Sequence, residues 1–212
     1  MDHPRSRSSV ADGRIIITGT GRTGTTFLVQ LFSALGFDTG FTVEEALNGV
    51  DEISKAGLER TLLDRTNPYV IKSPLFIDEL MEALENRRIQ IHMAIIPVRD
   101  LFAAAESRRR VYAEAEARGK SGALHPGSLW HTQKPEQQEE KLAIQFHKSV
   151  FSLMRFDVPV IFPEFPLLVR DPRYLFRKMQ PLMEEHGVDQ AAFLAAHARV
   201  SRPDLIHDFR KP

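Results

Sequence analysis

Apolar runs of strand length alternate with helical patterns along most of this chain. Residues 14–18 (RIIIT), 69–72 and 158–162 are short apolar runs, and residues 89–98 alternate apolar with polar or small side chains, which is the period of a β-strand. Strands that alternate with helices are typical of βαβ units, whose parallel strands are covered on both faces. The sequence therefore predicts an α/β fold, a three-layer sandwich with a central parallel sheet flanked by helices.

The predicted helices follow apolar positions at helical spacing, as at Leu142, Phe146 and Val150. They cover residues 25–35, 75–85, 101–117, 135–155, 172–186 and 189–199, and residues 41–65 are expected to be mostly helical. Residues 118–134 hold three glycines and a proline and are predicted to form a long irregular loop. We expect this loop to act as a lid or to shape the access of an acceptor, that is, a molecule that receives a transferred group. His125 and His131 would then either touch the acceptor or lie in solvent.

Composition limits the classes of function. The 212 residues suit one domain over residues 14–212, preceded by a polar, flexible tail at residues 1–13. Lys plus Arg and Asp plus Glu number 28 each, so no general basic field favours nucleic acid, and any anion site has to be local. The absence of cysteine excludes disulfides, thiolate zinc sites and cysteine nucleophiles. Without an apolar signal region or a run of 18 apolar residues, we expect a cytoplasmic protein with no membrane span.

Residues 19–26 (GTGRTGTT) connect the first predicted strand to the first predicted helix. Glycines let successive backbone N–H groups face an anion, the helix N-terminus adds positive partial charge, and the hydroxyls add donors. The spacing matches a P-loop, except that Thr25 stands where a P-loop has lysine and Arg22 supplies the cation. The residues predicted to bind the cofactor here are Gly21, Arg22, Thr23, Gly24, Thr25 and Thr26.

Arg22 favours a transferred group of low charge. It is suited to grip a 5′-phosphate, or the bridging oxygen that gains charge as a group departs. A sulfuryl group carries less negative charge than a phosphoryl dianion, so its transfer has less need of a metal ion. No metal-ligating cluster emerges from the sequence, and we expect no metal to be required.

The loop resembles that of the sulfotransferases that use 3′-phosphoadenosine 5′-phosphosulfate (PAPS), especially their bacterial and tyrosylprotein-type members. Downstream, Arg99 follows the third predicted strand and Ser107 lies eight residues later, the spacing with which that family grips the 3′-phosphate of its donor. Lys72, in the sequence IKSP, resembles the family's Lys-x-Pro strand end. Residues 167–179 (LLVRDPRYLFRKM) resemble its late Val-Arg-Asp-Pro helix start.

The resemblance implies a PAPS-dependent sulfotransferase with a P-loop NTPase-like fold. Arg22 and the loop amides would hold the 5′-phosphosulfate, Arg99 and Ser107 the 3′-phosphate, and Lys72 would assist the leaving phosphate or the sulfuryl oxygens. The family's base is a histidine after the second strand, which residues 73–76 lack, or a glutamate after the first helix, which predicts Glu44, with Glu45 as the alternative. The chain departs from the family in its short length, in lacking the C-terminal Arg-Lys-Gly phosphate loop, and in having Phe27 where many members have Trp.

Two other interpretations stay open. One is a metal-dependent P-loop kinase that uses ATP and Mg²⁺, with Asp100 as the Mg²⁺-binding acid, although Thr25 in place of lysine argues against it. The other is a non-catalytic nucleotide-binding module that kept the anion cradle. The acceptor is expected to be a small molecule or polymer with a hydroxyl or an amine, not a nucleic acid. Its identity and the oligomeric state are not predicted.

Overall fold

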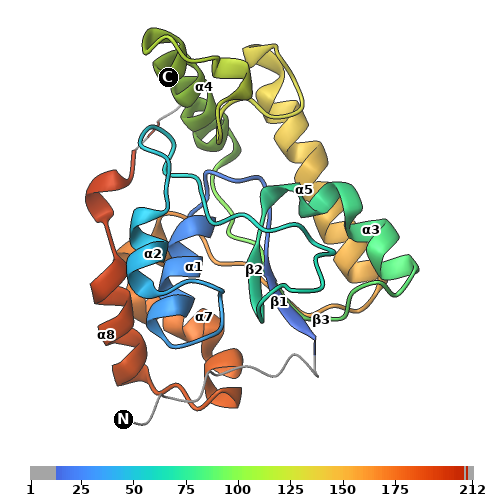
Figure 1. The fold of residues 1–212 in the computed structure, drawn as a ribbon, viewed down its shortest axis with the longest axis vertical. Helices are drawn as coiled ribbons and strands as arrows, with labels where there is room; N and C mark the ends of the chain where they lie inside the picture. The colour runs from blue at the N-terminus through green and yellow to red at the C-terminus, as the bar shows by residue number, and fades with distance from the viewer. Residues whose placement is uncertain (1–12, 208, 210–212) are drawn as a thin grey trace.

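The computed structural model describes residues 13–207 and 209, and its centre is a four-stranded sheet in which each pair of neighbouring strands is parallel (Figure 1). The strands are β1 (Arg14–Ile17), β2 (Val70–Lys72), β3 (Ile91–Ile95) and β4 (Val160–Ile161), and they stand in the order β2-β1-β3-β4. Helices connect successive strands. The predicted α/β fold with a central parallel sheet is confirmed.

Most helices lie close to their predicted positions. Their bounds are α1 (Thr25–Ala34), α2 (Val43–Asn48), α3 (Ile77–Glu85), α4 (Leu101–Ala117), α5 (Gln138–Arg155), α6 (Leu167–Arg170), α7 (Pro172–Glu185) and α8 (Gln190–Val200). Asp100, Asp171 and Asp189 begin α4, α7 and α8, because each carboxylate accepts a hydrogen bond from the backbone N–H three residues ahead. These aspartates explain why the starts of the three helices are visible in the sequence.

The two faces of β1 bury alternate side chains, since successive residues of a strand point to opposite sides of a sheet. Ile15 and Ile17 are fully buried in a core built with α1, α7 and α8. Ile16 is fully buried on the other face, with residues of α3 and α5. Figure 1 shows these two groups of helices on either side of the sheet, which makes the three layers of the predicted sandwich.

The expectation of a mostly helical segment over residues 41–65 is wrong, because α2 is the only helix described there. Asp51 and Asp64 accept hydrogen bonds from backbone N–H groups two or three residues ahead, and such bonds stabilise turns in place of a helix. Lys55, Gly57 and Leu58 have positive φ, a backbone conformation incompatible with a right-handed helix. The chain therefore runs from α2 to β2 as a series of turns.

The fourth strand is shorter than the run at residues 158–162 predicts. Only Val160–Ile161 is regular, and both residues are half-buried rather than buried. The reason is its position at the edge of the sheet, where β4 pairs with β3 on one side alone.

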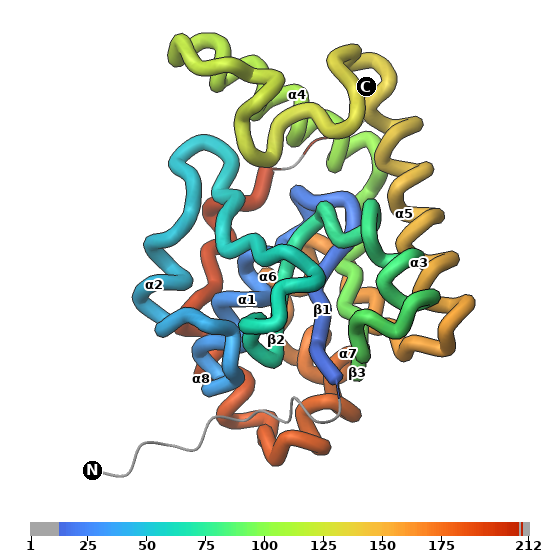
Figure 2. The backbone as a smooth tube through the Cα atoms, turned by 45° about the vertical axis from the view of Figure 1, so that its right-hand side comes forward, coloured from blue at the N-terminus to red at the C-terminus, as the bar shows by residue number. Residues whose placement is uncertain are grey.

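Residues 118–134 are irregular, as predicted, apart from one turn of 3₁₀ helix at Gly122–Leu124. Arg108 Nη1 donates to the Ser128 carbonyl, and both backbone groups of Trp130 bond to the side chain of Gln138. Figure 2 shows this loop beside residues 49–57, above the end of the sheet at which the strands finish. The segment is thus a packed wall, held by buried polar contacts.

The ends of the chain add little to this picture. The predicted tail lies outside the described residues, except for Gly13. Within residues 13–207, no helix combines the length and the apolar character that crossing a bilayer requires.

Candidate active site

The loop at residues 19–26 has the conformation of an anion cradle. Gly19, Gly21 and Gly24 have φ of 119°, 66° and 87°, values that residues with side chains rarely adopt. Gly24 is the N-cap of α1, and no described side chain bonds the first-turn amides there. Thr23 has a buried hydroxyl without a partner among the described residues. The backbone N–H groups that begin α1 are therefore left for a ligand.

The side chains predicted to hold the two ends of the donor meet in one place. Arg22 Nε donates to Ser107 Oγ at 3.1 Å, and Arg99 Nη1 donates to the Arg22 carbonyl at 3.1 Å. Ser107 itself is only 3% exposed. The structure thus brings the glycine loop, the end of β3 and the middle of α4 to a single point.

Arg99 is held rigidly at that point. Its guanidinium lies over the ring of Phe165 at 4.7 Å and over that of Phe209 at 5.4 Å, and Nη2 donates to the His207 carbonyl at 2.6 Å. Cation–π contacts on a partly buried guanidinium restrict its orientation. The C-terminal segment therefore orders Arg99.

Arg108 is buried, although a run of charged residues such as Arg108-Arg109-Arg110 is typical of a solvated helix face. Arg108 is 4% exposed and bridges two segments, donating to the Thr20 carbonyl and to the Ser128 carbonyl at 2.5 Å each. Burial and the charge of Arg22 lower its pKa to about 9. The signal for this burial was present in the sequence, because Arg108 shares its helical spacing with Ala104, Val111 and Ala115, which are all buried.

The positively charged side chains around Arg22 lie close together. Burial, with Arg99 and Arg110 nearby, lowers the pKa of Arg22 to about 10, and Asp51 opposes the shift only in part. Buried like charges are costly unless a counter-charge joins them. The arrangement is therefore one that an anion would stabilise.

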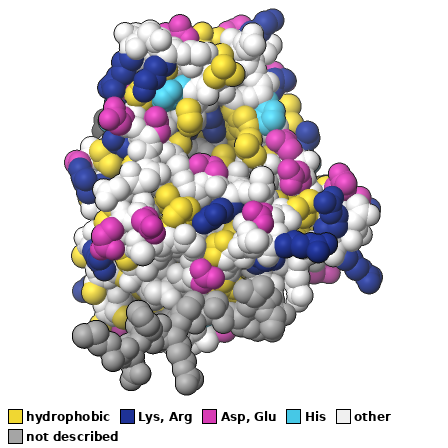
Figure 3. All heavy atoms as spheres, viewed as in Figure 1, with side chains coloured by type: hydrophobic (Ala, Val, Ile, Leu, Met, Phe, Trp, Pro, Cys, Tyr) yellow, Lys and Arg dark blue, Asp and Glu magenta, His cyan; other side chains and the backbone are white. Residues whose placement is uncertain are grey.

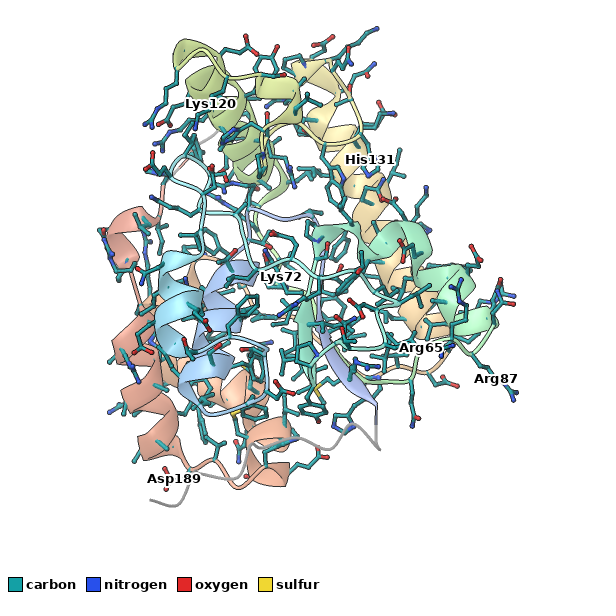
Figure 4. All side chains as sticks on the ribbon, viewed as in Figure 1. Arg65, Lys72, Arg87, Lys120, His131 and Asp189 are labelled. Atoms are coloured by element: carbon teal, nitrogen blue, oxygen red, sulfur yellow. The ribbon has the colours of Figure 1, made fainter. Side chains whose placement is uncertain are left out.

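Lys72 lies at the end of β2 and is 2% exposed. Its Nζ donates to Glu59 Oε1 at 2.5 Å, to the Gly57 carbonyl at 2.8 Å and to Thr26 Oγ1 at 3.3 Å. Burial lowers the pKa of Lys72, while Glu59 opposes the shift. In Figure 4 Lys72 lies at the centre of the molecule. It is thus a buried cation attached to the loop, and not an exposed strand end.

These groups line a cavity of about 1040 Å³. Its basic lining includes Arg22, Lys72, Arg99, Arg108, Arg110 and Arg199, and its acidic residues are Glu52, Glu59 and Glu114. The apolar side chains Ile53, Leu75 and Trp130 belong to the same lining. Figure 3 shows a hollow in the upper half of the molecule, with basic side chains recessed between apolar ones. The cavity thus combines an anion site with an apolar wall.

The predicted base lies elsewhere. Glu44 is on α2, with a side chain 71% exposed, and it accepts from Arg199 Nη2 at 2.8 Å. The Glu45 carboxylate accepts from the Thr42 backbone N–H at 2.8 Å and completes a capping box that begins α2. Neither residue is among those that line the cavity. A role for Glu44 stays a prediction that this geometry does not favour.

The two histidines of the loop at residues 118–134 differ. His125 lines the cavity, has a side chain 7% exposed, and places Nε2 3.0 Å from Asp51 Oδ1. His131 has a side chain 35% exposed, 3.7 Å from Asp78, and lies beside α5 near the top of Figure 4. Both histidines stand out in the sequence, whereas Asp51 and Glu59 do not, because no local pattern indicates which turn carboxylates face a distant loop.

Comparison with known proteins adds little. No protein-family model and no curated protein matches the chain. Among solved structures it is similar to a sulfotransferase domain from the curacin biosynthetic pathway, with 16% identity over 87% of this chain and 77% of that one, at a TM-score of 0.48. The likeness is too distant to assign a function. Within the described part of the chain, no three His, Asp or Glu side chains are grouped so as to hold a metal ion.

Proposed function

We propose that this protein is a sulfotransferase that moves a sulfuryl group from PAPS to a hydroxyl or an amine. The observation that carries the proposal is the meeting of Arg22, Arg99 and Ser107 at one basic cavity. PAPS has two separate anionic ends, a 5′-phosphosulfate and a 3′-phosphate. A ligand of that kind requires cations from distant parts of the chain to face one space, which is the arrangement found here.

Separate groups of the protein would donate hydrogen bonds to each end of PAPS. The amides that begin α1, with Thr23, Thr25 and Thr26, would hold the 5′-phosphosulfate together with Arg22. Arg99 and Ser107 would hold the 3′-phosphate, whose oxygens would replace the bond between Arg22 and Ser107.

The same cations stabilise the charge that develops during transfer. As the acceptor attacks sulfur, the S–O bond to the 5′-phosphate breaks and negative charge gathers on the departing phosphate. Lys72 is held at the loop by its bond to Thr26, and Arg22, a member of the loop, is bonded to the Ser54 carbonyl, so both cations already lie close to where this charge would develop. A positioned donor of this kind contributes about 100- to 1000-fold in rate.

Thermal unfolding with candidate nucleotides tests the proposal. A ligand at a hundred times its dissociation constant adds about 2.7 kcal/mol to the free energy of unfolding. We expect this shift with 3′-phosphoadenosine 5′-phosphate, and a much smaller shift with adenosine 5′-phosphate, which lacks the 3′-phosphate. Stabilisation by ATP with Mg²⁺ and not by the bisphosphate would refute the proposal and favour a kinase.

A further inference from the structure

The cavity carries a histidine and carboxylate pair that donor binding does not use. His125, from the loop at residues 118–134, places Nε2 3.0 Å from Oδ1 of Asp51, which lies 74 positions earlier. His125 belongs to the cavity lining, and its side chain is 7% exposed. This pair is the candidate for the proton-transfer chemistry of the site.

Asp51 is fixed and ionised. Its Oδ1 accepts from Ile53 N, Ser54 N and Ser54 Oγ at 3.0, 2.7 and 2.9 Å. Burial opposes ionisation, but the hydrogen bonds from Ser54 and His125 outweigh it and lower the pKa of Asp51 to about 2. An ionised carboxylate can only accept a hydrogen bond, so Nε2 of His125 carries the hydrogen. The lone pair of the neutral ring is then on Nδ1, the nitrogen left for a ligand.

The pair lies next to the anion loop. The Ser54 carbonyl, in the turn that holds Asp51, accepts a hydrogen bond from Arg22 Nη1. Gly127, two residues after His125, approaches the same nitrogen so closely that a Cβ there would lie 3.5 Å from it. The histidine therefore shares a wall with the arginine proposed to hold the transferred group.

Of the other cavity carboxylates, Glu52 is exposed to solvent, and the remaining two are already occupied by cations. Glu59 is paired with Lys72 at 2.5 Å, and Glu114 with Arg118 at 2.6 Å. His125 instead faces a carboxylate, which stabilises the imidazolium that forms when the ring takes up a proton.

We propose that His125 is the general base of the transfer and that Asp51 is its positioning residue, an inference that rests on the function proposed above. His125 Nδ1 takes the proton of the acceptor hydroxyl while that oxygen attacks the sulfur of PAPS. The S–O bond to the 5′-phosphate breaks, and its electron pair leaves with 3′-phosphoadenosine 5′-phosphate. The proton stays on the imidazolium, beside Asp51, until it passes to water.

The reverse reaction allows a test without knowledge of the natural acceptor. Phenyl sulfate and 4-nitrophenyl sulfate serve as sulfuryl donors to 3′-phosphoadenosine 5′-phosphate, and release of the phenol is measured. In this direction the His125 imidazolium donates the proton, which matters more for phenyl sulfate because phenolate is the poorer leaving group. We expect His125→Gln to lose about 100-fold or more with phenyl sulfate and clearly less with the nitro ester. Asp51→Asn should lose roughly 10-fold, with the same order of the two esters.

His131→Gln is the matched control. His131 lies on the same loop and also has a carboxylate nearby, that of Asp78, but it is not among the residues that line the cavity. It should leave both rates within twofold of the wild type. Calorimetric binding of 3′-phosphoadenosine 5′-phosphate should be unchanged in all three variants. If the wild type does not bind 3′-phosphoadenosine 5′-phosphate, the proposed function itself is refuted. If binding is intact and His125→Gln turns over both esters at the wild-type rate, only the assignment of His125 as the base is overturned.

A spectroscopic measurement decides the matter without turnover. Long-range ¹H–¹⁵N correlation spectra of ¹⁵N-labelled protein distinguish the two tautomers of a neutral histidine, and the His125 signals are identified by their absence in His125→Gln. We expect the tautomer with hydrogen on Nε2. The opposite tautomer would overturn the proposal, because Nδ1 would then have no lone pair to accept a proton.

Discussion

The two sides of the cavity are built in different ways. On the side proposed to bind PAPS, the donor side, Arg22 and Arg99 lie in the loops that follow β1 and β3, and Ser107 lies inside α4. The facing side consists of residues 49–59 and 118–134, which are irregular and are joined by side-chain bonds such as that of His125 to Asp51. Regular elements therefore fix the first side, whereas contacts between distant loops fix the second.

This difference separates two kinds of failure. A change on the donor side should remove ligand binding and leave the fold intact, because strand ends keep their places without it. A change in the bonds of the facing side should cost stability, because contacts between segments, and no regular element, hold those loops in place. Substitutions on each side of the cavity test this separation.

Replacement of Arg22 should have the largest effect on activity. Arg22→Gln removes the cation of the loop while keeping a polar side chain, and we expect turnover of 4-nitrophenyl sulfate to fall by about 1000-fold. Affinity for 3′-phosphoadenosine 5′-phosphate should fall at least roughly tenfold, because a charge-assisted bond to phosphate is lost. Calorimetry and the phenol assay measure the two losses.

Arg22→Lys is the control for charge. It should recover part of the affinity and less of the rate, because a lysine is a point charge without the forked geometry of the guanidinium. The melting temperatures of both variants without ligand should stay near that of the wild type, because a milder repulsion with Arg99 and Arg110 or its removal offsets the weakened bond to the Ser54 carbonyl. A large fall in melting temperature for Arg22→Lys would mean that Arg22 supports the fold, and the contrast between the two sides would fail.

The same division between the two sides separates the site features that the sequence predicts from those that it does not. The glycine loop is visible in the sequence because a strand, a helix and a short spacing define it, and Arg99 and Ser107 are visible through the family resemblance, which also rests on a short spacing. The partners of Lys72 and His125 were not, because Glu59 and Asp51 lie in turns where a helix was expected. Contacts between irregular segments depend on the whole packed structure and leave no periodic pattern.

Replacement of Arg108 should have the largest effect on stability. The guanidinium joins the Thr20 carbonyl on the donor side to the Ser128 carbonyl on the facing side. Arg108→Met keeps much of the buried volume but leaves these carbonyls without their partner, so we expect a loss of about 2 to 4 kcal/mol in the free energy of unfolding. Urea unfolding monitored by circular dichroism measures the loss.

Arg118→Met is the matched control, at the C-terminal end of the same helix. Arg118 is 47% exposed and pairs with Glu114 at 2.6 Å, an exposed i,i+4 pair. Such a pair contributes roughly 0.3 to 0.5 kcal/mol. An equal loss in the two variants would show that the bridge made by Arg108 contributes no more than a surface contact.

The smallest predicted effect is the dependence of stability on pH that Asp51 creates. Its folded-state pKa of about 2 lies below the ordinary value of 3.8, so the ionised carboxylate is the form that the fold stabilises. That stabilisation is fully present above the ordinary pKa and is lost as pH falls through about 2. A shift of this size corresponds to about 2 kcal/mol.

Asp51→Asn should therefore be less stable than the wild type by about 2 kcal/mol at pH 6, and the difference should shrink between pH 4 and pH 2. Urea unfolding of the two proteins across this range measures it. If the difference in stability between the two proteins stays constant across this range, the substitution has disturbed packing and has not removed a stabilising charge. Asp51 would then hold the turn by shape, and the ionised partner that fixes the tautomer of His125 would be missing. The stability curve thus tests, without any substrate, the charge on which the facing side of the cavity depends.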